Sequence, residues 1–136
     1  MKHLKHKREF EFKDDSQPSL LDRFEVNDLN LSQVTLTATE VTSLCPITHQ
    51  PDYHKITISY IPTKTCVESK SLKLYLGSWR QVGIMTEPLC YRIAQDLFNL
   101  LSPRWIKVIV SSAFRGGISV EATSILPPLY KDRLPK

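Results

Sequence analysis

The chain lacks a long hydrophobic run, an apolar leader and any paired cysteine spacing. Within its 136 residues, no apolar stretch approaches the roughly 20 residues that a membrane-spanning helix needs. The segment from Met1 to Asp15 is charged throughout and has no apolar core of the kind found in secretory signals. We therefore predict a cytoplasmic protein without a membrane partner.

The three cysteines, Cys45, Cys66 and Cys90, are an odd number at unrelated spacings. This argues against a disulfide framework and leaves a free, reactive thiol as one option. A zinc site built from these cysteines and His49 lacks the paired Cys-x-x-Cys or His-x-x-x-His spacing of structural zinc. We expect no metal.

The length fits one domain, and the hydrophobic fraction of 41% is normal for a globular protein. We expect an N-terminal arm or tail over 1–30, a catalytic domain over 31–126 and a C-terminal tail over 127–136. The net charge of +4 suits an anionic ligand without requiring nucleic acid.

Alternating apolar and polar residues predict strands over 34–39 and 56–61, and residues 105–110 and 118–123 predict two more around a turn at 116–117. Residues 63–66 are expected to form a turn. The apolar residues that follow have the spacing of an amphipathic helix ending near 80–83, namely Leu72, Tyr75, Leu76 and Trp79.

A second helix is expected from Thr86, as its N-cap, to Leu101, where Ser102 and Pro103 stop it. The order is strand, strand, helix, helix, strand, strand (ββααββ). It predicts an α+β fold in which an antiparallel four-stranded sheet carries two helices on one face. Such a sheet leaves two open edges, which oligomerisation can cover.

Several residues in this arrangement can carry chemistry. Cys45 follows the first strand, and Asp52 lies seven residues later in the same loop. A carboxylate beside a thiol can move protons during addition and elimination. The alternative is a buried structural cysteine and a turn-forming aspartate.

Charged residues flank both helices. Lys70 and Lys73 share a face near a helix N-terminus, where anions are favoured, although a solvated face explains them equally well. The Glu87 carboxylate can accept two N–H donors from a guanine-like edge, or can simply complement the helix dipole. Arg115 beside Gly116 is either a further phosphate contact or an exposed cation in a turn.

Taken together, three colinear segments resemble the QueF family of NADPH-dependent 7-cyano-7-deazaguanine reductases. They are Ser43–Asp52 (SLCPITHQPD), which resembles the nucleophile loop, Glu68–Tyr75 (ESKSLKLY), similar to the cofactor signature, and Arg115–Ser119 (RGGIS), similar to a C-terminal hairpin. The resemblance implies a tunnelling fold (T-fold) and a ring-forming homo-oligomer of two stacked pentamers, with active sites between subunits and no direct nucleic acid contact.

The resemblance also implies the reaction. Cys45 attacks the nitrile carbon of 7-cyano-7-deazaguanine to form a covalent thioimide, Asp52 moves protons, and NADPH supplies two hydrides to give the aminomethyl product used in queuosine tRNA modification. The substrate-binding positions are Glu87, Glu68, Ser69 and Thr86, and the cofactor-binding positions are Lys70, Ser71, Lys73, Arg115 and Gly116.

Two positions depart from the family pattern. Thr86 stands where the family usually has a histidine, and His49 stands where it usually has a glycine. We hypothesise that His49 partly replaces the missing imidazole.

Three other functions are compatible with parts of the sequence. One is a QueF-like amidinotransferase, which uses ammonia on nitrile-bearing tRNA and lacks the cofactor signature. The second is a T-fold binding protein with weakened catalysis. The third is a zinc enzyme similar to GTP cyclohydrolase, which needs a ligand set that this chain does not clearly supply.

Overall fold

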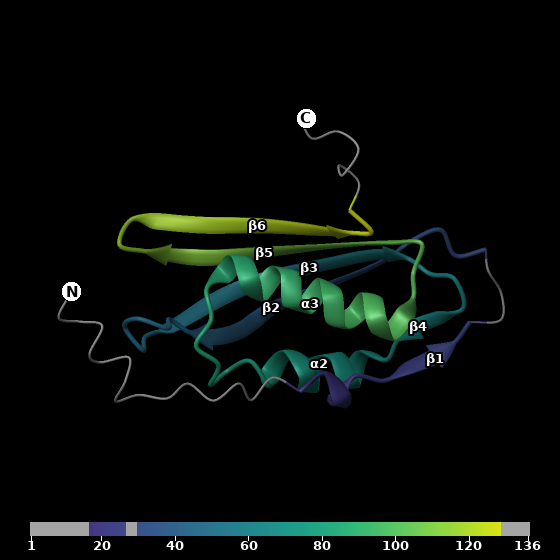
Figure 1. Cartoon of the computed structure of the whole chain (residues 1–136), viewed down its shortest axis with the longest axis horizontal. Helices are drawn as coiled ribbons and strands as arrows, with labels where there is room; N and C mark the ends of the chain where they lie inside the picture. The colour runs from purple at the N-terminus through teal and green to yellow at the C-terminus, as the bar shows by residue number, and fades with distance from the viewer. Residues whose placement is uncertain (1–16, 27–29, 129–136) are drawn as a thin grey trace.

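The computed structural model describes residues 17–26 and 30–128. Its main sheet is antiparallel and has the strand order β2-β3-β5-β6 (Figure 1). These strands are Val34–Leu44, Pro51–Ile61, Trp105–Arg115 and Ile118–Leu126. The helices α2 (Ser69–Gly77) and α3 (Thr86–Leu101) lie between β3 and β5 in the chain. The predicted four-stranded sheet and two helices are therefore confirmed.

The four main strands are longer than the alternating patterns predict. The pattern over 56–61 misses the first half of β3, and that over 105–110 misses the end of β5. Both missed segments carry polar residues on the face that packs inward, His54 and Ser112. A polar residue at an inward position interrupts the apolar alternation from which a strand is recognised.

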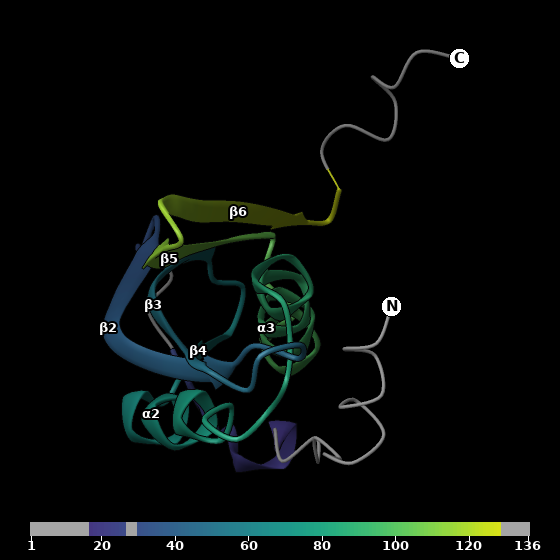
Figure 2. The same cartoon turned by 90° about the vertical axis from the view of Figure 1, so that its left-hand side faces the viewer.

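The core lies between the sheet and the helices. The sheet curves so that α3 lies within its concave side (Figure 2), where α3 packs against β5 and β6. All four residues of the predicted apolar stripe, including Trp79, are buried. However, α2 ends at Gly77, so Trp79 lies in the turn beyond the helix. No helix in the described ranges is long and apolar enough to cross a membrane.

One local prediction, the turn at 63–66, is wrong. The expected turn at 63–66 contains the start of a short strand, β4 (Thr65–Val67), which pairs with β1 (Arg23–Glu25). The one-turn 3-10 helix Pro18–Leu20 precedes β1, and Leu21 joins the core. This docked segment falls within the range 1–30, whereas residues 1–16 and 27–29 of that range lie outside the described residues.

The predicted N-cap of α3 is also wrong, because Met85 holds that position and Thr86 is the first helical residue. The Thr86 hydroxyl lies 2.7 Å from the Ser112 hydroxyl of β5 instead of capping its own helix. Thr86 is buried at this contact. The contact with Ser112, and not helix capping, therefore determines where the Thr86 side chain points.

A β-bulge interrupts the pairing of β2 with β3, and another interrupts the pairing of β5 with β6. Opposite β3, the pairing moves from Ala38–Ile56 to Val41–His54, so β2 has one extra residue. Since side chains alternate in a strand, the extra residue moves the inward face from Ala38 to Val41, and then to Ser43. A similar shift between Ser112 and Arg115 puts Arg115 on the face of β5 that carries Ser112.

The segment before α3 is held against the end of β2. Leu44 and Gly83 form an isolated parallel bridge. The Leu44 N–H donates to the Val82 carbonyl at 2.9 Å, and the Ile84 N–H donates to the Leu44 carbonyl at 3.0 Å. This bridge joins the strand that ends before Cys45 to the chain that leads into α3.

Candidate active site

Cys45 is the first residue after β2, and the loop behind it is closed by two backbone hydrogen bonds. The Cys45 N–H donates to the Gln50 carbonyl at 2.8 Å, and the Cys45 carbonyl accepts from the His49 N–H at 3.0 Å. His49 adopts a left-handed conformation, with φ of 63°. Cys45 is only 3% exposed. The loop therefore fixes the thiol in one place.

The surroundings of Cys45 favour its thiolate. Burial alone raises the pKa of the Cys45 thiol, but hydrogen bonds from the Thr48 side chain, the backbone N–H groups of Thr48 and Ile47, and Arg115 outweigh burial and lower the pKa to about 7. The thiolate is the nucleophilic form of cysteine. Cys45 is thus in substantial part ionised at neutral pH.

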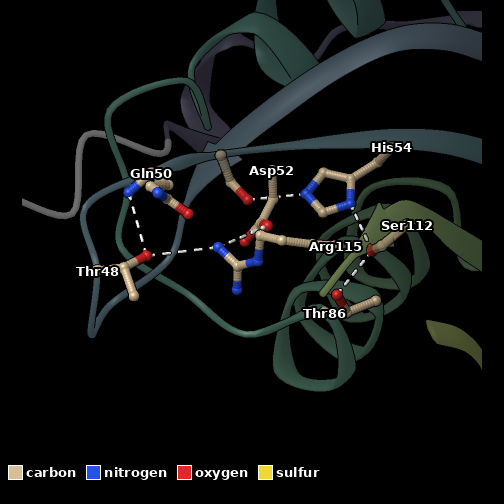
Figure 3. A network of polar contacts seen from close by, with 8 residues as sticks. Thr48, Gln50, Asp52, His54, Thr86, Ser112 and Arg115 are labelled. Atoms are coloured by element: carbon tan, nitrogen blue, oxygen red, sulfur yellow. Dashed lines mark hydrogen bonds and ion pairs between the residues drawn. The ribbon is translucent and has the colours of Figure 1, made fainter. Parts of the chain in front are cut away.

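Arg115 connects the thiol to the predicted carboxylate. Its Nη1 lies 3.2 Å from Asp52 Oδ1 in an ion pair, and it makes a longer contact of 3.5 Å with the Thr48 hydroxyl (Figure 3). The neighbouring anionic groups, Cys45 first and then Asp52, raise the pKa of the Arg115 guanidinium. The structure therefore brings Cys45, Asp52 and Arg115 together.

This arrangement has the parts of a nucleophilic centre. It holds a polarised thiol, a carboxylate that can donate or accept a proton, and a cation close to both. The predicted closeness of Cys45 and Asp52 agrees with this geometry, but Asp52 does not lie in the loop, because β3 begins at Pro51 and Asp52 is its second residue. The roles of both residues stay predictions. Arg115 had been expected at a cofactor phosphate, and its present contacts are with the nucleophile loop.

Sequence reasoning missed a chain of polar side chains behind this centre. His54 Nε2 lies 2.8 Å from the Ser43 hydroxyl, and His54 Nδ1 lies 2.8 Å from the Ser112 hydroxyl. Ser112 in turn contacts Thr86 (Figure 3). The signal that could have found them is a histidine at an inward position of β3, in register with a serine of β5.

The α2 N-terminus uses two of the predicted ligand residues for its own structure. The Glu68 carboxylate accepts from the backbone N–H of Lys70 at 2.8 Å and of Ser71 at 3.2 Å, as an N-cap does. The Ser71 hydroxyl is buried and donates to the Glu68 carbonyl, and it accepts from the Asp22 N–H. These groups are engaged within the chain.

A wide groove of about 1090 Å³ runs between α2 and β2. Its lining includes Ser69 and Lys73 from α2 and Arg80 from the following turn. Lys70 is exposed on the same helix. Of the predicted cofactor residues, Lys73 therefore lies in a cavity, whereas Gly116 lies at the β5–β6 turn with φ of 61°.

Glu87 occupies a different place. It is exposed in the first turn of α3 and borders a smaller cavity of about 410 Å³ between α3 and β6, together with Tyr91. No hydrogen bond or ion pair within the described residues joins Glu87 to the Cys45 loop. In the same parts of the chain, no group of three or more His, Cys, Asp or Glu side chains is placed to hold a metal ion.

Comparison with known proteins identifies relatives across most of the chain. The family model of QueF, described as QueF-like protein, matches residues 51–125. A protein of Anaeromyxobacter sp. (strain Fw109-5), named NADPH-dependent 7-cyano-7-deazaguanine reductase, is 42% identical over 68% of this chain and 75% of its own length. The Streptococcus mutans protein of that name is 55% identical over 60% of this chain and 51% of its own length.

A third relative of the same name, from Streptococcus thermophilus (strain CNRZ 1066), is 50% identical over 71% of this chain and 56% of its own length. This chain therefore spans about half the length of the streptococcal relatives. Among solved structures, the archaeosine synthase QueF-Like in the apo form aligns with a TM-score of 0.66 at 26% identity, over 71% of this chain and 94% of that one.

Proposed function

Because the chain belongs to the QueF family, we propose that it reduces the nitrile of 7-cyano-7-deazaguanine to an aminomethyl group with NADPH. The family relatives at 42% and 55% identity carry the name of this reductase. The observation that carries the proposal is a loop-held thiol with a pKa of about 7, close to an arginine that is paired with a carboxylate. Covalent capture of a nitrile needs a nucleophilic thiol with a proton-transferring group beside it, and these residues supply both.

In the first step the Cys45 thiolate adds to the nitrile carbon. A carbon–sulfur bond forms, one π bond of the nitrile breaks, and the nitrogen takes a proton to give a thioimide. Asp52, whose carboxylate borders the same site, takes the proton of the Cys45 thiol as the thiolate forms and passes it to the nitrogen. Arg115 favours the thiolate before attack and pairs with the Asp52 carboxylate after the proton has left.

Two hydrides and two further protons complete the conversion of the thioimide. After the first hydride and proton, the carbon–sulfur bond breaks and Cys45 leaves, giving an imine, and the second pair gives the primary amine. NADPH supplies each hydride. Within the chain, Cys45 holds the carbon and Asp52 exchanges the protons, and the burial of Cys45 limits access of water to the thioimide.

The groove between α2 and β2 fits the cofactor. Its volume of about 1090 Å³ is at the upper end of small-molecule sites. Lys73 and Arg80 line the groove and supply cations for phosphates, while Leu36 and Leu72 supply apolar surface. Lys70 adds a charge on the exposed side of α2. Ser71 is a weaker candidate, because its hydroxyl already bonds to Asp22 and Glu68.

Substrate recognition rests on Glu87. A carboxylate can accept two N–H donors from the pyrimidine part of a deazaguanine, which favours this base over bases without that edge. Glu87 borders a cavity along β6, an edge strand of the sheet. A T-fold ring in which copies pair β2 and β6 edges gives a site completed by a second subunit, and we assign Glu68, Ser69 and Thr86 to it.

The second candidate is an amidinotransferase that forms the same adduct but adds ammonia. Structural likeness to the archaeosine synthase QueF-Like favours it. We prefer the reductase, because its relatives are more similar, at 42% and 55% against 26% identity. The positively charged groove beside α2 also suits a dinucleotide.

The test is to incubate the protein with 7-cyano-7-deazaguanine and weigh it intact, then to add NADPH and follow its absorbance. We expect an adduct of the nitrile's mass, absent in Cys45→Ala, and two NADPH oxidised per nitrile. Asp52→Asn is expected to slow turnover by about 10²- to 10⁴-fold. An adduct that consumes ammonia and no NADPH identifies the amidinotransferase, and no adduct at all contradicts both.

A further inference from the structure

The polar chain Ser43–His54–Ser112–Thr86 links four separate parts of the fold. Ser43 is on β2, His54 on β3, Ser112 on β5, and Thr86 opens α3. The three contacts measure 2.8, 2.8 and 2.7 Å. Ser43, His54 and Thr86 are at most 8% exposed. Hydrogen bonds in such a setting are shielded from water and rigid when every group is satisfied.

Each member of this chain is a close sequence neighbour of a residue assigned to the reaction. Ser43 precedes Cys45 by two residues, and His54 follows Asp52 by two residues. In β3 this interval keeps Asp52 and His54 on the same face of the strand, and Cys45 directly follows the end of β2. The other two members show the same relationship, with Thr86 next to Glu87 and Ser112 just before the bulge that leads to Arg115.

A neutral His54 imidazole satisfies every hydrogen bond in the network Ser43–His54–Ser112–Thr86. If the Ser43 hydroxyl donates to Nε2, then Nδ1–H donates to Ser112 and the Ser112 hydroxyl donates to Thr86. The opposite tautomer reverses all three donors. Burial lowers the pKa of His54, although the charge of Asp52 opposes this. Burial therefore favours the neutral form of His54.

We propose that His54 is a positioning residue, which with Ser43, Ser112 and Thr86 forms a brace that fixes Cys45, Asp52, Glu87 and Arg115 relative to one another. His54 touches none of the reacting atoms in this arrangement. It acts through its neighbours, because both of its ring nitrogens bind hydroxyl groups on other strands. The part played by Glu87 and Asp52 rests on the proposed function.

If the brace exists, variants at its α3 end and variants at its β2 end should lose different properties. Thr86→Val and Ser112→Ala disconnect α3, so we expect kcat/KM for the nitrile to fall about 5- to 10-fold, while iodoacetamide alkylates Cys45 at the wild-type rate. Ser43→Ala disconnects β2, so we expect the alkylation rate at pH 7 to change by at least a few fold. His54→Phe loses both contacts and is expected to show both effects.

Partial rescue separates positioning from packing. His54→Asn keeps a polar group near Ser112, and His54→Gln keeps one near Ser43, so each is expected to restore one of the two readouts. In the His54→Phe background, Ser112→Ala is expected to lower kcat/KM by a smaller factor than it does in the wild type. The reason is that the contact between His54 and Ser112 is already lost. The control is Ser59→Ala, which removes a hydroxyl contact of 3.2 Å between β2 and β3 and is expected to leave both readouts unchanged.

The alkylation readout needs neither nitrile nor NADPH. It therefore tests the β2 end of the brace even if the wild-type protein forms no adduct, which is the outcome that contradicts the proposed function. Circular dichroism melting shows that each variant is folded. A folded His54→Phe variant with wild-type alkylation and wild-type kcat/KM overturns the brace. The brace is also overturned if the losses in alkylation rate and kcat/KM follow the melting temperature alone, with no rescue by His54→Asn or His54→Gln.

Discussion

Arg115 Nη1 lies 3.2 Å from Asp52 Oδ1, and this ion pair joins the β5–β6 hairpin to the start of β3. The bulge in β5 makes the contact possible, because it places Arg115 on the inward face of its strand. The same guanidinium helps to lower the pKa of the Cys45 thiol. One cation thus contacts both the Cys45 thiol and the Asp52 carboxylate.

The first prediction concerns the pH dependence of Cys45. With a pKa of about 7, alkylation by iodoacetamide should rise through neutral pH and level off above it, since only the thiolate reacts. Arg115→Gln removes one of the groups that favour the thiolate, so the midpoint of the curve of alkylation rate against pH should move to higher pH. The alkylation rate at pH 7 should fall several-fold, and the rate at pH 10 should not change.

Arg104→Gln is the matched control, because Arg104 is exposed at the opposite end of β5. Arg115→Lys keeps the charge but not the planar fork, so its midpoint should lie between those of Arg115→Gln and wild type. An Arg115→Gln midpoint equal to the wild-type midpoint contradicts the assignment of Arg115 to the thiol.

The second prediction concerns the groove between α2 and β2. Lys73→Ala and Arg80→Ala each remove a cation from its lining, so each should raise the KM for NADPH about 5-fold or more. The mass of the nitrile adduct on Cys45 should not change. Lys64→Ala is the control, because Lys64 is exposed outside the groove. Unchanged KM values in both groove variants place the cofactor elsewhere.

Much of the secondary structure can be predicted because local signals determine it. Periodic apolar residues mark α3, and Ser102 ends it with a left-handed φ of 44°. The short strand β4 has no such signal, because its pairing partner β1 lies about forty residues earlier in the chain. Pairing at that separation depends on the tertiary fold and not on local propensity.

The site was predicted in part for the same reason. Cys45 and Asp52 are seven residues apart, at the two ends of the connection between β2 and β3, so their closeness can be predicted from the sequence. Arg115, Ser112 and Thr86 reach the site from other elements. The bulge that places Arg115 adds a single residue to β5, and no periodic pattern predicts a one-residue insertion.

The third prediction separates two roles of Glu68. Its carboxylate caps α2, so Glu68→Ala should lower the free energy of unfolding by about 0.5–2 kcal/mol. Aspartate is also a good N-cap, so Glu68→Asp should recover most of this loss in a urea titration. If Glu68 also binds substrate, the KM for the nitrile should remain raised in Glu68→Asp. A wild-type KM in this variant restricts Glu68 to capping.

The last prediction concerns His49, for which we hypothesised a part in the chemistry. Its φ of 63° lies in the left-handed region, which costs a residue with a Cβ about 1–2 kcal/mol. His49→Gly removes this cost, although glycine also loses more chain entropy on folding. Its melting temperature should therefore equal or exceed that of wild type, whereas His49→Ala keeps the strain.

Turnover of the two variants then decides the role of the imidazole. The backbone N–H of His49 holds the Cys45 carbonyl at 3.0 Å whatever the side chain, so the thiol should stay in place in both. If the imidazole takes no part, turnover in His49→Gly should stay within about twofold of wild type, because the backbone contact still positions Cys45. A loss of tenfold or more in both variants, with melting curves intact, would instead place the His49 imidazole in the proton transfers.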